Sequence, residues 1–191
     1  MKSERLSVTA TRERLFAAAA ELFAERGYEA TTMTDIAGRA GTSRRTAFNY
    51  FPSKSDIPMF WTRRMADRSL IDADNVPAAS TEDRVRDYLR GITRLVEAEP
   101  DVSRQMMAGW ASAMGPIVYE STLVPDLEML LRHGVDDGLI DADTDVALAA
   151  RTISDALMGA TFRWVREVGT SYVDAVDSAA SLILRALRPT R

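Results

Sequence analysis

The sequence of 191 residues has no cysteine, a single histidine and no apolar run of the roughly 20 residues that a membrane-spanning helix requires. The lack of cysteine excludes disulfides, thiolate metal ligands and cysteine nucleophiles. With His133 as the one imidazole, neither a histidine-based metal site nor a Ser-His-Asp triad is expected. Residues 1–16 lack the apolar core of a secretory signal. We therefore expect a cytoplasmic protein that is not an enzyme and that holds no metal or cofactor.

The residues present are those of an ordinary globular protein, with 46% hydrophobic and 27% charged side chains. The charge is unevenly distributed, because residues 1–56 carry nine basic and seven acidic residues whereas the remainder carries 15 and 21. Within residues 36–55 there are four basic side chains and no acidic one. Such a stretch is a candidate phosphate-facing surface, although a solvated helix face would have the same composition.

Apolar residues recur at helical spacing along most of the chain, and no segment shows sustained β alternation. We therefore predict an all-α fold with about nine helices. Residues 1–9 lack periodicity and are predicted to be a loose arm before a helix that starts at Thr11 and ends at Gly27. Longer helices are predicted from Ser53 to beyond Met65 and, after a linker at 75–81, over residues 82–98, 102–114, 123–138, 144–168 and 172–187.

Two short helices are predicted between Gly27 and Ser53. Thr32 and Asp35 have the spacing of a capping box at the start of a helix of about two turns, which Gly41 ends. Ser43 is placed to cap the second short helix, and Pro52 terminates it. Two short helices joined by a tight glycine-containing turn are typical of a helix-turn-helix, whose second helix enters the major groove of DNA.

Helical spacing gives the second short helix an inner and an outer face. Ala47 and Phe51 fall on the side expected to pack against the first helix of the chain. Arginine hydrogen-bonds bidentately to guanine and asparagine to adenine, each worth about 1–3 kcal/mol of discrimination, whereas tyrosine and lysine suit phosphate contacts. The residues on the outer face or at the exposed start are Arg44, Arg45, Thr46, Asn49 and Tyr50.

Three motifs lie within this region, namely Thr31–Ala37 (TTMTDIA), Ala40–Ser43 (AGTS) and Thr46–Lys54 (TAFNYFPSK). The preceding helix adds Ala20–Phe23 (AELF) and the pair Gly27-Tyr28. Together these motifs resemble the DNA-binding domain of the TetR family of bacterial regulators. The resemblance covers about residues 12–60.

The resemblance implies a homodimeric repressor with a helix-turn-helix domain in residues 1–56 and a helical effector-binding and dimerisation domain in residues 57–191. It implies DNA contacts from Thr34, Ser43, Arg44, Arg45, Thr46, Asn49, Tyr50 and Lys54. Phe48 departs from the family pattern, because members usually have tyrosine there. A hydrogen bond from that hydroxyl to phosphate is therefore not available, and we assign Phe48 no contact.

No motif marks the C-terminal domain, where the resemblance implies a cavity for a small effector. Methionine and aromatic side chains adapt to apolar ligands, although ordinary core packing explains them equally well. We expect a small, largely apolar effector. The candidate effector-binding residues are Trp61, Met65, Met106, Met107, Trp110, Met114, Tyr119 and Phe162.

Two apolar stripes on the last two predicted helices are candidates for the dimer interface. Small residues on them would permit close packing of four helices from two chains. The alternative is that the stripes face the core of their own chain. The candidate interface residues are Ile153, Leu157, Ala160, Trp164, Val176, Ala180, Ile183 and Leu187.

One segment imitates a metal site. Asp141, Asp143 and Asp145 have the spacing of an EF-hand loop, but Val146 stands where that loop needs glycine and Thr152 where it needs glutamate. We predict that the segment caps the following helix instead.

The function predicted from these observations is a ligand-responsive repressor that binds a pseudo-palindromic operator in double-stranded DNA as a homodimer and is released by its effector. The alternative is an architectural or non-repressing DNA-binding protein that has no effector.

Overall fold

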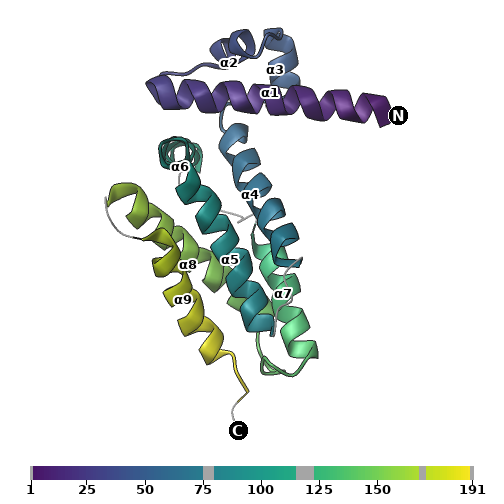
Figure 1. Cartoon of the computed structure of the whole chain (residues 1–191), viewed down its shortest axis with the longest axis vertical. Coiled ribbons are helices and arrows are strands. Elements are labelled where there is room, and N and C mark those ends of the chain that lie inside the picture. Colours follow the sequence, from purple (N-terminus) through teal and green to yellow (C-terminus); the bar gives the residue numbers. More distant parts are fainter. Residues whose placement is uncertain (1, 75–79, 115–122, 168–170, 190–191) are drawn as a thin grey trace. The chain divides into compact units, whose positions relative to one another are not determined.

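The computed structural model describes residues 2–74, 80–114, 123–167 and 171–189, and of residues 2–9, 73–74 and 110–114 only the backbone. Over these ranges the chain forms nine helices and no strand, which confirms the predicted all-α fold (Figure 1). The helices are α1 (Lys2–Arg26), α2 (Met33–Arg39), α3 (Arg44–Tyr50), α4 (Asp56–Asp74), α5 (Thr81–Ala98), α6 (Pro100–Met114), α7 (Val124–Asp136), α8 (Val146–Arg166) and α9 (Tyr172–Ala186).

The start of the chain differs from the prediction. Residues 2–9 are the first two turns of α1 and not a loose arm. This stretch contains no proline or glycine to interrupt a helix, and Lys2, Glu4, Arg5 and Leu6 are good helix formers. Apolar periodicity reports only which turns have a face to bury, so a helix that extends beyond its packed part leaves no such signal.

The described chain divides into two compact units. The first contains the chain up to Trp61 together with α6, and the second contains the chain from Thr62 to the end of α5 together with α7, α8 and α9. The predicted domain boundary lies between residues 56 and 57, and the sequence did not indicate that α6, far along the chain, packs with α1.

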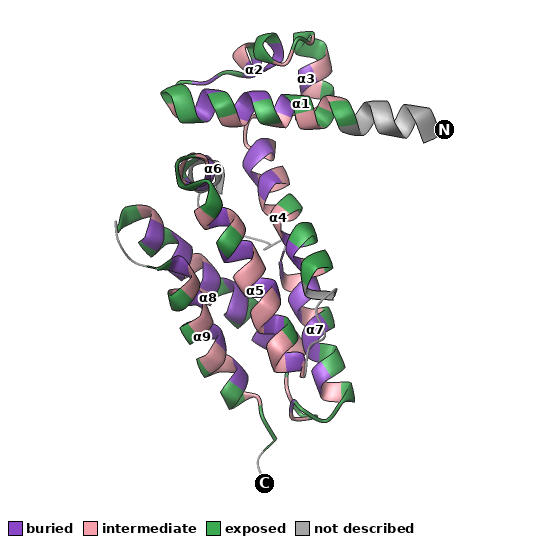
Figure 2. Ribbon diagram, viewed as in Figure 1, coloured by how far each residue is buried: buried purple, intermediate pink, exposed green. Residues whose placement is uncertain are grey.

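The core of the first unit explains why α2 and α3 form here. Leu15 and Phe23 of α1, Ile36 of α2, and Ala47 and Phe51 at α3 are completely buried. Figure 2 shows buried positions along α1, α2 and α3. Burying a large apolar side chain contributes about 1.5–3 kcal/mol, so these contacts stabilise two helices that are too short to persist alone. Gly27 has a φ of 86°, a left-handed conformation that ends α1 and turns the chain toward α2.

In the second unit α5 packs against α7 and α9, and α8 packs against α7 and α9. The core includes Tyr88 and Leu89 of α5, Leu131 of α7 and Ile153 of α8. The segment with EF-hand spacing caps α8, because the carboxylate of Asp145 accepts a hydrogen bond from the backbone N–H of Leu148 at 3.0 Å. Among the described residues no cluster of three metal-ligating side chains occurs. None of the described helices is long and apolar enough to cross a membrane.

Candidate nucleic-acid interface

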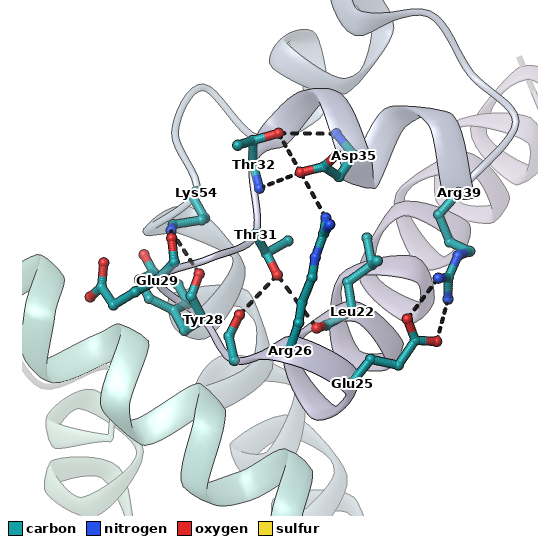
Figure 3. Close-up of polar contacts among 11 residues, drawn as sticks. Leu22, Glu25, Arg26, Tyr28, Glu29, Thr31, Thr32, Asp35, Arg39 and Lys54 are labelled. Carbon is teal, nitrogen blue, oxygen red and sulfur yellow. Dashed lines mark hydrogen bonds and ion pairs between the residues drawn. The ribbon is translucent and has the colours of Figure 1, made fainter.

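The start of α2 is fixed by the capping box that the sequence predicts. The Thr32 hydroxyl accepts a hydrogen bond from the backbone N–H of Asp35 at 3.2 Å, and the Asp35 carboxylate accepts one from the backbone N–H of Thr32 at 2.9 Å (Figure 3). The Arg26 guanidinium lies 2.7 Å from the same carboxylate. Hydrogen bonds from Thr32, with the Arg26 charge nearby, hold the pKa of Asp35 below its ordinary value. Thr34 is exposed in this first turn.

The start of α3 is fixed in a similar way. The Ser43 hydroxyl accepts a hydrogen bond from the backbone N–H of Thr46 at 3.0 Å, and the two hydroxyls lie 2.8 Å apart. Gly41 precedes this cap with a φ of 64°, a conformation that favours glycine in the turn between α2 and α3. Both hydroxyl groups are therefore used to define the geometry of α3.

The outer face of α3 has the arrangement that the sequence predicts. Arg44, Arg45 and Asn49 are exposed, and Tyr50 is half-buried. Neither arginine has a carboxylate partner among the residues that the structure describes. The Arg44 guanidinium instead lies over the ring of Phe48, 5.4 Å from its centroid. Phe48 thus supports a neighbouring cation, a role that the sequence did not reveal.

Other arginines near α3 are neutralised within the first unit. Arg39 of α2 pairs with Glu21 at 3.1 Å and with Glu25 at 2.8 Å, both on α1. Figure 3 shows the pair with Glu25. The hydrogen bond from Arg39 holds the pKa of Glu25 below its ordinary value. These pairs connect α2 to α1 and leave the uncompensated positive charge at the start of α3.

Lys54, for which a phosphate contact is predicted, makes contacts within the first unit that the sequence did not reveal. Its ammonium donates hydrogen bonds to the backbone carbonyls of Tyr28 at 2.8 Å and Glu29 at 3.4 Å (Figure 3). It also lies 4.1 Å from the centroid of the Tyr28 ring. In the free protein this cation therefore connects the end of α3 to the turn after α1, and a phosphate contact from Lys54 stays a prediction.

Tyr28 connects the end of α1 to α6, a contact that the sequence analysis did not identify. Its backbone N–H donates to Gln105 of α6 at 3.0 Å, and its ring lies against Gly109. A Cβ atom at Gly109 would lie 2.3 Å from the Tyr28 ring, so only glycine fits there. Burial raises the pKa of the Tyr28 phenol. The only sequence signal for this junction is a glycine in the middle of a helix.

The predicted effector residues occupy several places. Trp61, Met106 and Met107 are buried in the first unit, whereas Met65 is half-buried and Phe162 exposed in the second. The side chains of Trp110 and Met114, and all of Tyr119, lie outside the described residues. The second unit has a cavity of about 390 Å³ that none of these eight residues lines. The cavity is lined by Ser80, Thr81, Glu82, Gly138, Leu139, Ile140, Leu184, Arg188 and Pro189.

The predicted dimer stripes face the core of their own chain. Ile183 and Leu187 are half-buried, and the other six residues are buried within the single chain, namely Ile153, Leu157, Ala160, Trp164, Val176 and Ala180. Periodicity located the apolar faces of α8 and α9 but did not distinguish a partner chain from the protein's own core.

A buried polar group in the second unit was also missed by the sequence analysis. The Tyr88 hydroxyl donates to the carboxylate of Asp126 at 2.8 Å, and the Arg63 guanidinium lies 3.1 Å from that carboxylate. Burial, followed by the Asp126 charge, raises the pKa of Tyr88. Arg63 also donates to Asp67 one helical turn along α4 at 2.7 Å. This group connects α4, α5 and α7, and only the spacing of Arg63 and Asp67 was visible in the sequence.

Comparison with known proteins agrees with this geometry. Residues 15–57, which contain α2, α3 and most of the packed part of α1, match the model of the tetR family of bacterial regulatory proteins. The chain is 31% identical over 175 residues to the HTH-type transcriptional repressor KstR2 of Rhodococcus jostii, covering 86% of this chain and 84% of that protein. It is 26% identical to the repressor KstR of the same organism, covering 91% of this chain and 82% of that protein.

The fold matches a solved structure over nearly its whole length. Thermus thermophilus FadR, a TetR-family transcriptional repressor in complex with lauroyl-CoA, aligns with a TM-score of 0.74 and 22% sequence identity. The alignment covers 94% of this chain and 96% of that one. The chain belongs to the tetR family of bacterial regulatory proteins, and it is a DNA-binding, ligand-responsive transcriptional repressor that acts as a homodimer.

Proposed function

We propose that the repressor reads a pseudo-palindromic operator with one α3 helix from each protomer and leaves it when a small, largely apolar effector binds. The observation that carries this proposal is the pair of exposed arginines, Arg44 and Arg45, at the start of α3, where neither has a carboxylate partner within the described chain. Two such helices would enter successive major grooves about 34 Å apart. An effector shifts the balance only by its difference in affinity for the two states.

The exposure of the side chains at α3 supports two roles in this interface, base reading and phosphate contact. Arg44, Arg45 and Asn49 are exposed and have the donors that read base edges in the major groove. Thr34 and Tyr50 suit phosphate contacts on either side of these readers. Ser43 and Thr46, whose hydroxyls are engaged in the helix cap, reach DNA with less freedom than the arginines.

For the homodimer we propose the outer face of α8 and α9 as the contact surface. Leu148 and Phe162 are 56% and 39% exposed, and the helical repeat places them with Gly159 on one side of α8. Leu182 on α9 is 66% exposed. A second copy would cover these apolar side chains, whereas the predicted stripes on the inner face hold each protomer together.

For the effector we propose a long acyl group carried as its coenzyme A thioester, so that the acyl chain is the small, apolar part and coenzyme A is its charged carrier. The support is the lauroyl-CoA in the FadR structure and the presence of stearoyl-CoA in the structure of FadR from Bacillus subtilis. The repressor would act in the cytoplasm, where the chromosome lies, and by binding alone without a catalytic step.

A binding selection on genomic fragments at about 0.15 M salt tests the operator proposal, because specificity is interpretable only at a stated salt concentration. We expect recovery of a short inverted repeat near a promoter. Recovery of fragments without a common sequence would contradict it.

The effector proposal is tested on the recovered operator by adding lauroyl-CoA, with coenzyme A and laurate as matched controls. We expect release by the thioester and by neither control. Release by laurate alone would show that the coenzyme A part is not recognised, and no release by lauroyl-CoA or longer thioesters would contradict the proposed ligand class.

A further inference from the structure

The guanidinium of Arg12, on α1, lies against two aromatic rings of the first unit. Its guanidinium carbon lies 4.3 Å from the ring centroid of Phe60 and 5.3 Å from that of Phe51. These two rings meet edge to face at 5.6 Å, and Phe16 adds a third ring at 5.6 Å from Phe60. A guanidinium seated on aromatic faces keeps its N–H groups directed outward in its own plane, available to an acceptor.

The charge of Arg12 is not compensated within the described part of the chain. Arg12 is exposed and has no carboxylate within ion-pair distance there. Arg26 and Arg39, in contrast, pair with Asp35, Glu21 and Glu25. Arg12 therefore shares with Arg44 the property of a cation that lies against an aromatic ring and is not neutralised by a carboxylate of the described chain.

Arg12 lies beside the C-terminal end of α3, and this position indicates what its charge could bind. Phe51, under the guanidinium, is the C-terminal cap of α3, whereas Arg44 and Arg45 begin that helix. A helix of seven residues is about 10 Å long, and the major groove is about 12 Å wide. When the start of α3 reads base edges, a cation beside its other end lies near the phosphates that border the groove.

We propose that Arg12 is a phosphate-binding residue of the operator interface, held in place by Phe51 and Phe60. It extends the interface from the helix-turn-helix to α1, at a position that neither the motif nor the comparisons assign. This inference rests on operator binding by the first unit. The phosphate contact positions the protein without reading sequence, so its loss weakens operator and unrelated DNA alike.

The test measures the affinity of the full-length protein for an operator duplex and for an unrelated duplex over a range of salt concentrations. Arg12→Ala is expected to weaken both by a similar factor and to reduce the slope of log affinity against log salt by about one for each protomer that contacts DNA. Arg12→Lys is expected to retain the slope, because it retains the charge. Arg14→Ala, which removes an exposed arginine two residues away and so on another side of α1, is the matched control and is expected to leave the slope unchanged.

The melting temperature of each variant separates binding from folding, because loss of the cation–π contact alone would lower it. A lower melting temperature with an unchanged salt slope would assign Arg12 a purely structural role and overturn the proposal. An equal loss of slope in Arg12→Ala and Arg14→Ala would also overturn it, since the effect would then come from general charge. If the unaltered protein binds neither duplex, the proposed function itself fails, and the result is distinguishable from both.

Discussion

At the scale of single residues, the arginines of the first unit differ in what holds them. Arg26 and Arg39 are fixed by carboxylates and connect helices, whereas Arg44 and Arg45 meet none in the described chain. A carboxylate would compete with DNA for these groups, so its absence at the start of α3 is the electrostatic condition for base reading. The sequence located this condition in residues 36–55, because the stretch contains no acid.

Arg44→Ala and Arg45→Ala test base reading directly. Each is expected to relax specificity at one base pair and to cost about 1–3 kcal/mol on the intact operator, because a bidentate contact to guanine is lost. The measurement is the affinity for the operator and for its single-base variants at a fixed salt concentration. An equal loss on every variant would identify the arginine as a phosphate contact.

At the scale of helices, the sequence was most informative where a side chain bonds to its own local backbone. The caps of α2 by Thr32 and of α3 by Ser43 were both predicted and are both present. The capping box at α2 depends on charge as well, because the hydrogen-bonded Asp35 has a lowered pKa. Its contribution to stability is complete above about pH 4, the ordinary pKa of an aspartate, and is lost as the pH falls through the lowered folded value.

Asp35→Asn is therefore expected to reduce the dependence of stability on pH in the acid range. The unaltered protein should lose urea resistance as the pH falls below about 4, and the variant should lose less because no carboxylate has to be protonated there. The measurement is the urea midpoint at neutral pH and at acid pH. Asp143→Asn, which removes an exposed carboxylate from a loop, is the control and should follow the unaltered protein.

The packing of α6 on Tyr28 gives a second prediction at this scale. Gly109→Ala is expected to lower the free energy of unfolding by about 1–3 kcal/mol, because the new methyl group would overlap the Tyr28 ring. Gly38→Ala in α2 is the matched control, since a Cβ there meets nothing within 4 Å. It is expected to stabilise the protein by up to about 1 kcal/mol through helix propensity. Equal effects of the two substitutions in urea unfolding would contradict the close contact.

The contacts that the sequence predicted less well are those between residues far apart along the chain. The hydrogen bond between Tyr28 and Gln105 joins residues 77 positions apart, and no local pattern announces it. Tyr88 and Asp126 are likewise joined only by the fold. Lys54 was predicted to face phosphate from its place in a motif, but the motif does not show that two carbonyl groups of the chain accept its hydrogen bonds.

At the scale of the whole molecule, periodicity reaches a different limit. It identified the apolar faces of α8 and α9, but a stripe that faces the core of its own chain has the same spacing as one that faces a partner. Ile153, Leu157 and Val176 are covered by their own chain. The exposed apolar residues on the opposite face, Leu148 and Leu182, break the helical pattern and are therefore the more informative sign of a second copy.

Leu182→Glu is expected to dissociate the homodimer, because it would place a carboxylate at the centre of the proposed contact. Sedimentation should show a monomer. Operator affinity should fall more than affinity for unrelated DNA, because the two recognition helices are no longer linked in one dimer. Ile71→Glu, at a 58% exposed site on α4, is the control and should remain dimeric. A dimeric Leu182→Glu would place the interface elsewhere.

The contact between Arg44 and Phe48 has a consequence for the thermodynamics of binding. An arginine that becomes ordered on DNA loses up to about 2 kcal/mol in side-chain entropy. The ring of Phe48 already restricts the rotamers of Arg44 in the free protein, whereas the structure shows no such support for Arg45 among the described side chains. The phenylalanine that stands in place of the usual tyrosine thus lacks a hydroxyl for phosphate but keeps the aromatic ring, and it is this ring that reduces the entropic cost of ordering the neighbouring base reader.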